Sequence, residues 1–156
     1  MKESIAQSFI VSLILFFFGI LVILYFGSIN YSKAYKAKNR IITILEKYGS
    51  YENAAKNPAK VEIEQNLQRG GYQTTSDNTF NKCSKFAPNN EEVGKLIYPS
   101  NDSSRKYDYC IIEYNSGIGK YYQVVTFMRF DIPVIGGMLE FAVKGETKVL
   151  YENING

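Results

Sequence analysis

An uninterrupted apolar run near the N-terminus constrains this chain more than any other feature of its sequence. The run extends from Phe9 to Phe26 and contains eighteen residues without a charge. As a helix it would measure about 27 Å, close to the ~30 Å hydrocarbon core of a bilayer. The run therefore predicts one membrane-spanning helix.

Two other interpretations of the run are open but fit it less well. A secretory signal peptide has an apolar region of about 7–15 residues followed by small residues at its cleavage site. Here the run ends in Tyr25 and Phe26 and leads on to Tyr31. A buried helix of a soluble domain normally carries a polar stripe, whereas only Ser12 and Gly19 interrupt this run. We therefore expect a membrane anchor.

The rest of the chain is long enough for one further unit with its own core. Of the 156 residues, 130 (156 minus 26) follow the run. We expect two regions, with residues 1–48 forming a transmembrane and extended helix and residues 49–156 an extracellular α+β domain. The net charge is only +3, from 18 basic and 15 acidic side chains spread along the chain. This weak bias argues against nucleic acid as a partner.

The composition also disfavours an enzyme. Histidine is absent, which removes His-based triads and His-containing zinc sites, and two cysteines cannot form a four-cysteine site. Neither Gly70-Gly71 nor Gly136-Gly137 belongs to a phosphate-binding loop motif. We expect no catalytic residue, no cofactor and no bound metal.

Two groups of carboxylates are the remaining candidates for chemistry. Glu91, Glu92 and Asp102 could bind calcium through loop oxygens, but their spacing has no EF-hand pattern, and a solvated acidic loop explains them better. Asp131 and Glu140 flank a strand connection and could form the carboxylate pair of a glycosidase. Surface positions at strand ends are the simpler interpretation of both.

The two cysteines, Cys83 and Cys110, lie in the part of the chain expected outside the membrane. An even number of cysteines in an exported domain favours a disulfide, the alternative being two unrelated buried thiols. The bond would close a loop of 27 residues (110 minus 83) and contribute about 3–3.5 kcal/mol in the chain-entropy model.

The orientation in the membrane is predicted differently by two signals. Lys33, Lys36, Lys38 and Arg40 follow the run, so the positive-inside rule places the large domain in the cytoplasm. The cysteine pair indicates the opposite. We favour an outside domain because the basic cluster begins seven residues beyond Phe26, on a continuing helix where it could meet anionic headgroups or partner subunits.

The helix is expected to continue beyond the membrane as far as Tyr48. No Gly or Pro lies between Gly27 and Tyr48, and Gly49 provides a C-terminal stop. Counted from Glu3, a helix of this extent would be about 69 Å long. Its outer half is amphipathic, because apolar side chains recur there at three- and four-residue steps. These positions are Tyr31, Ala34, Ala37, Ile41, Ile44, Leu45 and Tyr48.

A second helix is predicted over residues 58–69. Asn57 is a suitable N-cap, Pro58 suits the first helical position, and Gly70-Gly71 ends the segment. Its apolar face is narrow and consists of Val61, Ile63 and Leu67. Residues 72–102 are expected to form a long loop anchored by Cys83, with one strand or short helix at Val93, Leu96, Ile97 and Tyr98.

The last third of the chain predicts an antiparallel sheet of three to four strands. Residues 107–114 and 120–132 are rich in β-branched and aromatic residues and flank a turn at residues 115–119. Residues 139–151 alternate between an apolar and a charged face. Gly145 in this strand predicts a bulge or sharp bend. The expected apolar face consists of Leu139, Phe141, Val143, Thr147, Val149 and Tyr151, opposite Glu140, Lys144, Glu146 and Lys148.

The connection between the last two strands is apolar and has two open interpretations. It could be a wide turn folded onto the core, or an exposed apolar tip that touches the membrane or a partner. Its candidate contact residues are Ile132, Pro133, Val134 and Ile135.

The overall layout resembles that of type IV pilins and pseudopilins, and most closely the TadE-like pseudopilins of tight-adherence pilus systems. The resemblance lies in Phe26-Gly27, Tyr31 and Asn39-Arg40 on the helix, and in an ending, residues 121–152, that is similar to the closing hairpin of such proteins. It covers residues 1–40 and 121–156, but not the middle of the chain with Cys83. Where prepilins usually carry a glutamate, this chain has Ser8.

This resemblance implies a pilin-like fold and candidate contacts along the helix. Tyr31 and Tyr35 would meet partner subunits, and Gly19, seven residues after Ser12, would let a neighbouring helix approach closely. The other interpretation of Gly19 and Ser12 is that they have no specific role, because small residues are common in transmembrane helices. The residues expected to pack in the membrane or against other helices are Phe9, Ser12, Phe16, Gly19, Ile23 and Phe26.

Two hypotheses of different classes follow. In the first, the chain is a non-enzymatic, single-pass cell-membrane protein that serves as a minor subunit or membrane component of a surface pilus, secretion or DNA-transfer apparatus. Its partners would be membrane lipid and other pilin-like or assembly-machine proteins, in a homo- or hetero-oligomer that extends into a surface fibre. In the second, it is a membrane-tethered extracellular domain that binds a ligand or cell-wall polymer through its Tyr-rich sheet and long loop.

Overall fold

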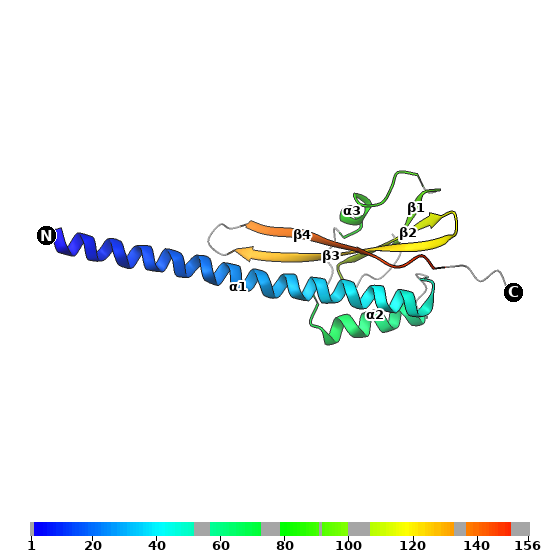
Figure 1. Cartoon of the computed structure of the whole chain (residues 1–156), viewed down its shortest axis with the longest axis horizontal. Coiled ribbons are helices and arrows are strands. Elements are labelled where there is room, and N and C mark those ends of the chain that lie inside the picture. Colours follow the sequence, from blue (N-terminus) through cyan, green and yellow to red (C-terminus); the bar gives the residue numbers. More distant parts are fainter. Residues whose placement is uncertain are drawn as a thin grey trace.

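The computed structural model describes residues 2–51, 57–72, 79–90, 92–99, 107–132 and 137–150, with side chains described outside residues 2–6, 130–132 and 137–139. These residues form a long helix, two shorter helices and a four-stranded antiparallel sheet of order β1-β2-β3-β4 (Figure 1). This is the predicted α+β arrangement. The elements are α1 (Lys2–Tyr48), α2 (Pro58–Arg69), α3 (Thr79–Ser84), β1 (Gly94–Tyr98), β2 (Tyr109–Ser116), β3 (Gly119–Ile132) and β4 (Gly137–Glu146).

Helix α1 runs without a break from the apolar segment into the folded part of the chain (Figure 1). Its 47 residues correspond to about 70 Å. It ends at Tyr48 as predicted, because Gly49 adopts a positive φ of 71° and its N–H bonds to the carbonyl of Leu45 at 2.9 Å. The apolar segment and the helix that packs on the sheet are therefore one continuous element.

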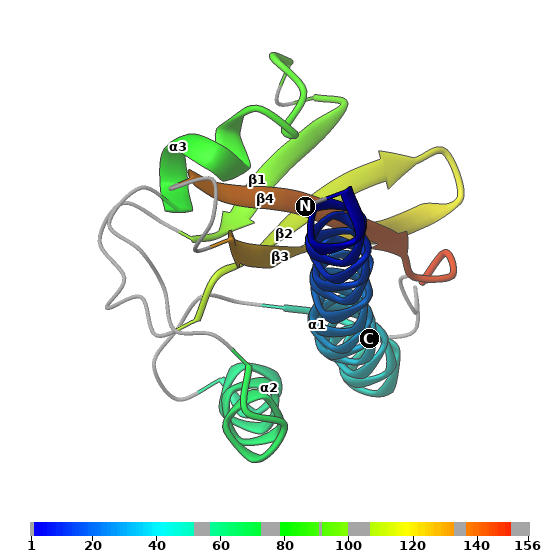
Figure 2. The ribbon, with the colours of Figure 1, turned by 90° about the vertical axis from the view of Figure 1, so that its left-hand side faces the viewer.

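The sheet is covered on both faces. Helix α1 crosses one face, with α2 beside it, and α3 lies over the other face (Figure 2). On the α1 face, Thr126 donates from its hydroxyl to the carbonyl of Ala34 at 3.0 Å, which records how closely the helix approaches β3. Tyr31 and Tyr48, which the periodicity placed on this apolar stripe, are exposed instead. The buried residues of the stripe are Ala34, Ala37, Ile41, Ile44 and Leu45.

Helix α2 has the predicted bounds and caps. The side-chain oxygen of Asn57 accepts from the N–H groups of Ala59 at 2.8 Å and Lys60 at 3.3 Å, which satisfies two donors of the first turn. Ile63 and Leu67 are buried as expected, but Val61 is exposed. Because α2 packs mainly against α1, the narrow apolar face that contains Ile63 and Leu67 is sufficient for this contact.

The β2–β3 hairpin is confirmed, with a tighter turn than predicted. Ser116 pairs with Gly119, so only Gly117 and Ile118 connect the strands. The predicted strand or short helix near residue 96 is the strand β1, which pairs with β2. Helix α3 was not predicted. Residues 72–102 were expected to form a long loop whose one strand or short helix lay near residue 96.

The last strand ends earlier than the alternation predicted. β4 stops at Glu146, and the N–H of Tyr122 bonds at 2.9 Å to the hydroxyl of Thr147 instead of to a carbonyl. This side-chain acceptor interrupts the ladder, although Leu150 pairs once more with Lys120. Tyr151, the predicted end of the strand, lies outside the described residues.

Two features of β4 differ from expectation. The pairing of Gly145 with Val124 is regular, so the bulge, one of the two expectations for this glycine, is absent. A Cβ at Gly145 would lie 2.8 Å from Lys38 Cδ and 2.9 Å from Ile42 Cδ1 of α1, so a larger residue would require these side chains to shift. Phe141, expected on the buried face, is exposed because β4 is an edge strand.

Gly119 is the glycine where the sheet leaves the least room. A Cβ at this position would lie 2.5 Å from the backbone oxygen of Leu150. We expect Gly119→Ala to lower the free energy of unfolding by about 1–3 kcal/mol, because backbone must move to admit the methyl group. Gly117→Ala, two residues away, meets nothing within 4 Å and should have a much smaller effect. Urea unfolding of both variants in detergent checks this, and equal losses would contradict it.

Candidate functional site

The N-terminal half of α1 is exposed on all sides. From Phe9 to Phe26 no part of the described chain covers it, and the exposed fractions of the large predicted packing residues range from 40% at Ile23 to 68% at Phe9. Among the described residues, α1 is the helix that is long and apolar enough to cross a membrane. Gly19 has open space around it, so another helix can approach closely there. The remaining predicted packing residues, Ser12, Phe16 and Phe26, are exposed as well.

Two tyrosines lie where α1 enters the head, by which we mean the C-terminal half of α1 together with α2, α3 and the four-stranded sheet. Tyr31 and Tyr35 are exposed and stacked, with 6.1 Å between ring centroids. The amine of Lys38 lies 4.3 Å from the centroid of Tyr35. The other candidate partner contacts cannot be placed beside them: the side chain of Ile132 and residues 133–135 lie outside the described part of the chain.

The predicted disulfide between Cys83 and Cys110 is present, with 5.6 Å between the Cα atoms. Both cysteines are completely buried and pack with Val125 and Phe127 on the sheet face opposite α1. The bond attaches α3 to β2, so it fixes the middle of the chain to the sheet. Disulfides of this kind persist in oxidising compartments.

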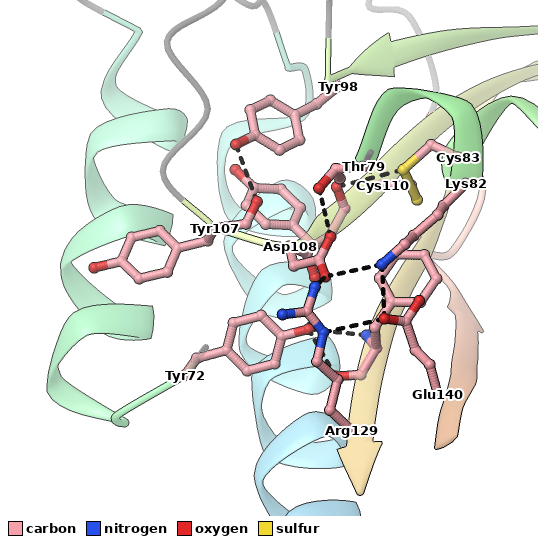
Figure 3. A network of polar contacts seen from close by, with 12 residues as sticks. Tyr72, Thr79, Lys82, Cys83, Tyr98, Tyr107, Asp108, Cys110, Arg129 and Glu140 are labelled. Carbon is pink, nitrogen blue, oxygen red and sulfur yellow. Dashed lines mark hydrogen bonds and ion pairs between the residues drawn. A yellow bond between two sulfur atoms is a disulfide. The ribbon is translucent and has the colours of Figure 1, made fainter. Parts of the chain in front are cut away.

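A network of charged side chains lies at the edge of this second core (Figure 3). The carboxylate of Asp108 is fully buried, and it accepts from the hydroxyl of Thr79 at 2.7 Å and from the guanidinium of Arg129. Glu140 Oε2 lies 2.7 Å from Lys82 Nζ and accepts from Arg129 Nε at 3.0 Å. Lys82 also lies 3.8 Å from the Asp108 carboxylate, so positive and negative groups alternate.

This network joins α3, β3, β4 and the residue before β2. Removal of one partner from such a buried pair typically costs about 3–5 kcal/mol, because the other charge stays buried. Glu140, interpreted from sequence as a surface residue, has only 22% of its side chain exposed. The side chain of Asp131, the other member of the predicted carboxylate pair, lies outside the part of the chain whose side chains are described. The geometry fits a structural role.

Sequence reasoning missed this network because its members are far apart in the chain. Lys82 and Glu140 are 58 residues apart, and no short motif connects them. The one available signal was Asp108 next to a strand of apolar and aromatic residues, where a carboxylate needs a partner if it is buried.

Buried tyrosines form the centre of the core on the α1 face. Tyr98 stacks on Tyr109 with 4.2 Å between centroids, and Tyr51 meets Tyr98 edge-on at 6.5 Å. The hydroxyls of Tyr51 and Tyr109 are buried without a hydrogen-bond partner, since the contact between the two phenols does not reach hydrogen-bond geometry. Burial raises the pKa of both phenols well above the usual value.

A groove of about 280 Å³ lies between α1 and the C-terminal end of α2. Lys33, Lys36 and Arg40 line it from α1, and Gly70 lines it from the end of α2. The predicted carboxylate site at Glu91, Glu92 and Asp102 falls mostly outside the described residues. Within the described parts of the chain, no group of three or more His, Cys, Asp or Glu residues could hold a metal ion.

Comparison with known proteins does not identify a family. No family model, no curated protein and no solved structure matches the chain.

The buried phenols predict how stability depends on alkaline pH. In the unfolded chain they ionise near pH 10, whereas in the fold their raised pKa values keep them neutral. Stability is therefore complete below about pH 10 and falls as the pH rises beyond it. In Tyr51→Phe/Tyr109→Phe we expect this fall to be smaller and stability near pH 8 to be unchanged or higher, because two unpaired hydroxyls are removed.

Urea midpoints measured in detergent between about pH 8 and pH 11 test this expectation. The matched control is Tyr31→Phe/Tyr35→Phe, which makes the same chemical change at two exposed residues. An alkaline slope that is identical in the buried variant, the control and the unchanged chain would contradict the prediction.

Proposed function

We propose that this protein is a non-enzymatic, single-pass membrane subunit of pilin-like type, a minor subunit or membrane component of a surface pilus, secretion or DNA-transfer apparatus. One observation carries the proposal: the exposed apolar half of α1 continues without a break into the helix that forms the core of the head. The head is proposed to lie outside the cell, which a buried disulfide supports.

The continuity of α1 favours a packed assembly over a simple tether. A tether needs only about 20 apolar residues and works equally well with a flexible linker. Here any helix that packs on the apolar half of α1 also determines where the head lies, because no flexible linker separates the apolar half from the head. Gly19 and the exposed Tyr31–Tyr35 pair supply a close-approach point in the membrane and an aromatic contact above it.

The alternative of a membrane-tethered binding domain has less support. Its binding surface was to be the Tyr-rich sheet, but three of the five tyrosines on the four strands are buried. Tyr98, Tyr109 and Tyr122 are no more than 2% exposed, so their rings pack in the core and are not accessible to a ligand.

In-cell photo-crosslinking tests the assembly. With a photo-reactive phenylalanine in place of Phe16 or Tyr35, we expect ladders of covalent oligomers, because both positions would face neighbouring subunits. The same group in place of Val61, exposed on α2, is the control and should give fewer. Monomers alone at Phe16 and Tyr35 would refute the subunit proposal, and a monomer that retains a soluble ligand would support the alternative.

The orientation needs exposed probes, because Cys83 and Cys110 are buried and bonded. We expect a membrane-impermeant maleimide to label Lys95→Cys in intact cells, since Lys95 is exposed on the head. Gln7→Cys, at the other end of the apolar run, should be labelled only after lysis. The reverse pattern would place the head in the cytoplasm, as the positive-inside rule predicts.

A further inference from the structure

The groove between α1 and α2 carries a concentrated positive charge. Lys33, Lys36 and Arg40 are three and four residues apart, which places them on one face of α1. All three are exposed, and no acidic residue is among the described residues that line the groove. The cations repel one another at this spacing, so an anion bound between them would be stabilised.

The described neighbours do not neutralise this charge. None of them forms an ion pair with the three cations; Arg40 donates one hydrogen bond, to the carbonyl of Asn66 at 3.3 Å. The same Asn66 carbonyl also accepts from the N–H of Gly70, and the Leu67 carbonyl accepts from the N–H of Tyr72. The α2 C-terminus therefore presents few free acceptors to repel an anion.

Further along the two helices the charge changes. An adjoining groove of about 280 Å³ includes Glu62, whose carboxylate lies 2.8 Å from the amine of Lys47. Of the described cations that line the two grooves, Lys33 and Lys36 lie at the end of the α1–α2 interface nearest the apolar segment, and Arg40 borders both grooves. An anion is expected to enter at that end.

The position along α1 indicates which anion this is. Lys33 lies seven residues beyond Phe26, or about 10 Å, and the headgroup layer extends about 5–7 Å beyond the hydrocarbon. Side chains on a helix point back toward its N-terminus, so the lysine amines reach toward the headgroups. Phe26 and Ile29, both exposed, lie seven and four residues before Lys33 on the same face. An apolar stripe therefore leads directly into the basic groove.

We propose that this groove binds the phosphate group of an anionic membrane lipid, whose acyl chain lies along Phe26 and Ile29. The inference depends on α1 spanning the membrane but not on assembly into a pilus. Lys33 and Lys36 hold the phosphate as point charges, and Arg40, fourteen residues beyond Phe26, adds positive charge at the outer end of the groove. Bound lipid would hold the head at a defined depth.

Lipid binding to the full chain in a neutral maltoside detergent tests the proposal. Native mass spectrometry would count bound phosphatidylglycerol and phosphatidylcholine during titration. We expect selective retention of phosphatidylglycerol, and about 30-fold weaker binding in Lys33→Gln/Lys36→Gln, on the scale of lysine attraction to anionic lipid. The matched control Lys85→Gln/Lys95→Gln removes two exposed lysines after α3 and on β1, and should keep the affinity.

A second variant separates the groove from general surface charge. Gly70→Met keeps all three cations but places a side chain beside Arg40 Nη1, 3.1 Å from the expected Cβ, and should weaken lipid binding by about tenfold, because the added side chain fills the groove. Equal binding by Gly70→Met and the unchanged chain, or equal losses in both lysine pairs, would overturn the proposal. So would displacement of the lipid by millimolar inorganic phosphate, which would identify a free anion as the ligand. Assembly is tested by photo-crosslinking and lipid binding by native mass spectrometry. The subunit proposal and the lipid proposal can therefore fail independently.

Discussion

The burial of one face of α1 against β3 is the contact on which the other elements depend. The small side chain of Ala34 lets the helix lie close to β3, where the hydroxyl of Thr126 bonds to the Ala34 carbonyl, and Gly145 of β4 packs against Lys38 and Ile42 of α1. Helix α2 then packs on α1, and the hydroxyl of Tyr72, just beyond α2, bonds to the backbone of Asp108 and Phe127. The helix that carries the exposed apolar segment is thus also the scaffold of the head.

Tyrosine serves this core in a way that phenylalanine could not. The hydroxyl of Tyr98 donates to the carbonyl of Tyr107, and that of Tyr122 accepts from the N–H of Tyr51, so aromatic side chains inside the core also bind segments between helices and strands. Such bonds satisfy backbone groups that regular secondary structure leaves unpaired. Tyr51 and Tyr109, with unpaired hydroxyls, are the exceptions in this core.

Local signals explain which parts of the fold could be predicted from sequence. Asn57 caps the start of α2 and Gly49 ends α1, both through hydrogen bonds to residues nearby in the chain. The alternation of apolar and polar residues can likewise be recognised within a single strand. The end of β4 depends instead on the Thr147 hydroxyl meeting Tyr122, 25 residues away. The Asp108–Arg129 pair and the basic groove likewise arise only when separate elements meet. The pilin resemblance itself remains a proposal.

If α1 spans the membrane as proposed, its length gives small movements in the membrane a large effect outside it. Membrane helices tilt by about 20° on average, and over about 70 Å such a tilt moves the far end sideways by about 24 Å. Because the C-terminal half of α1 forms part of the core of the head, the head tilts together with the helix and does not move independently of it. The lipid or the neighbouring helices that pack on the N-terminal half of α1 would then determine the position of each head.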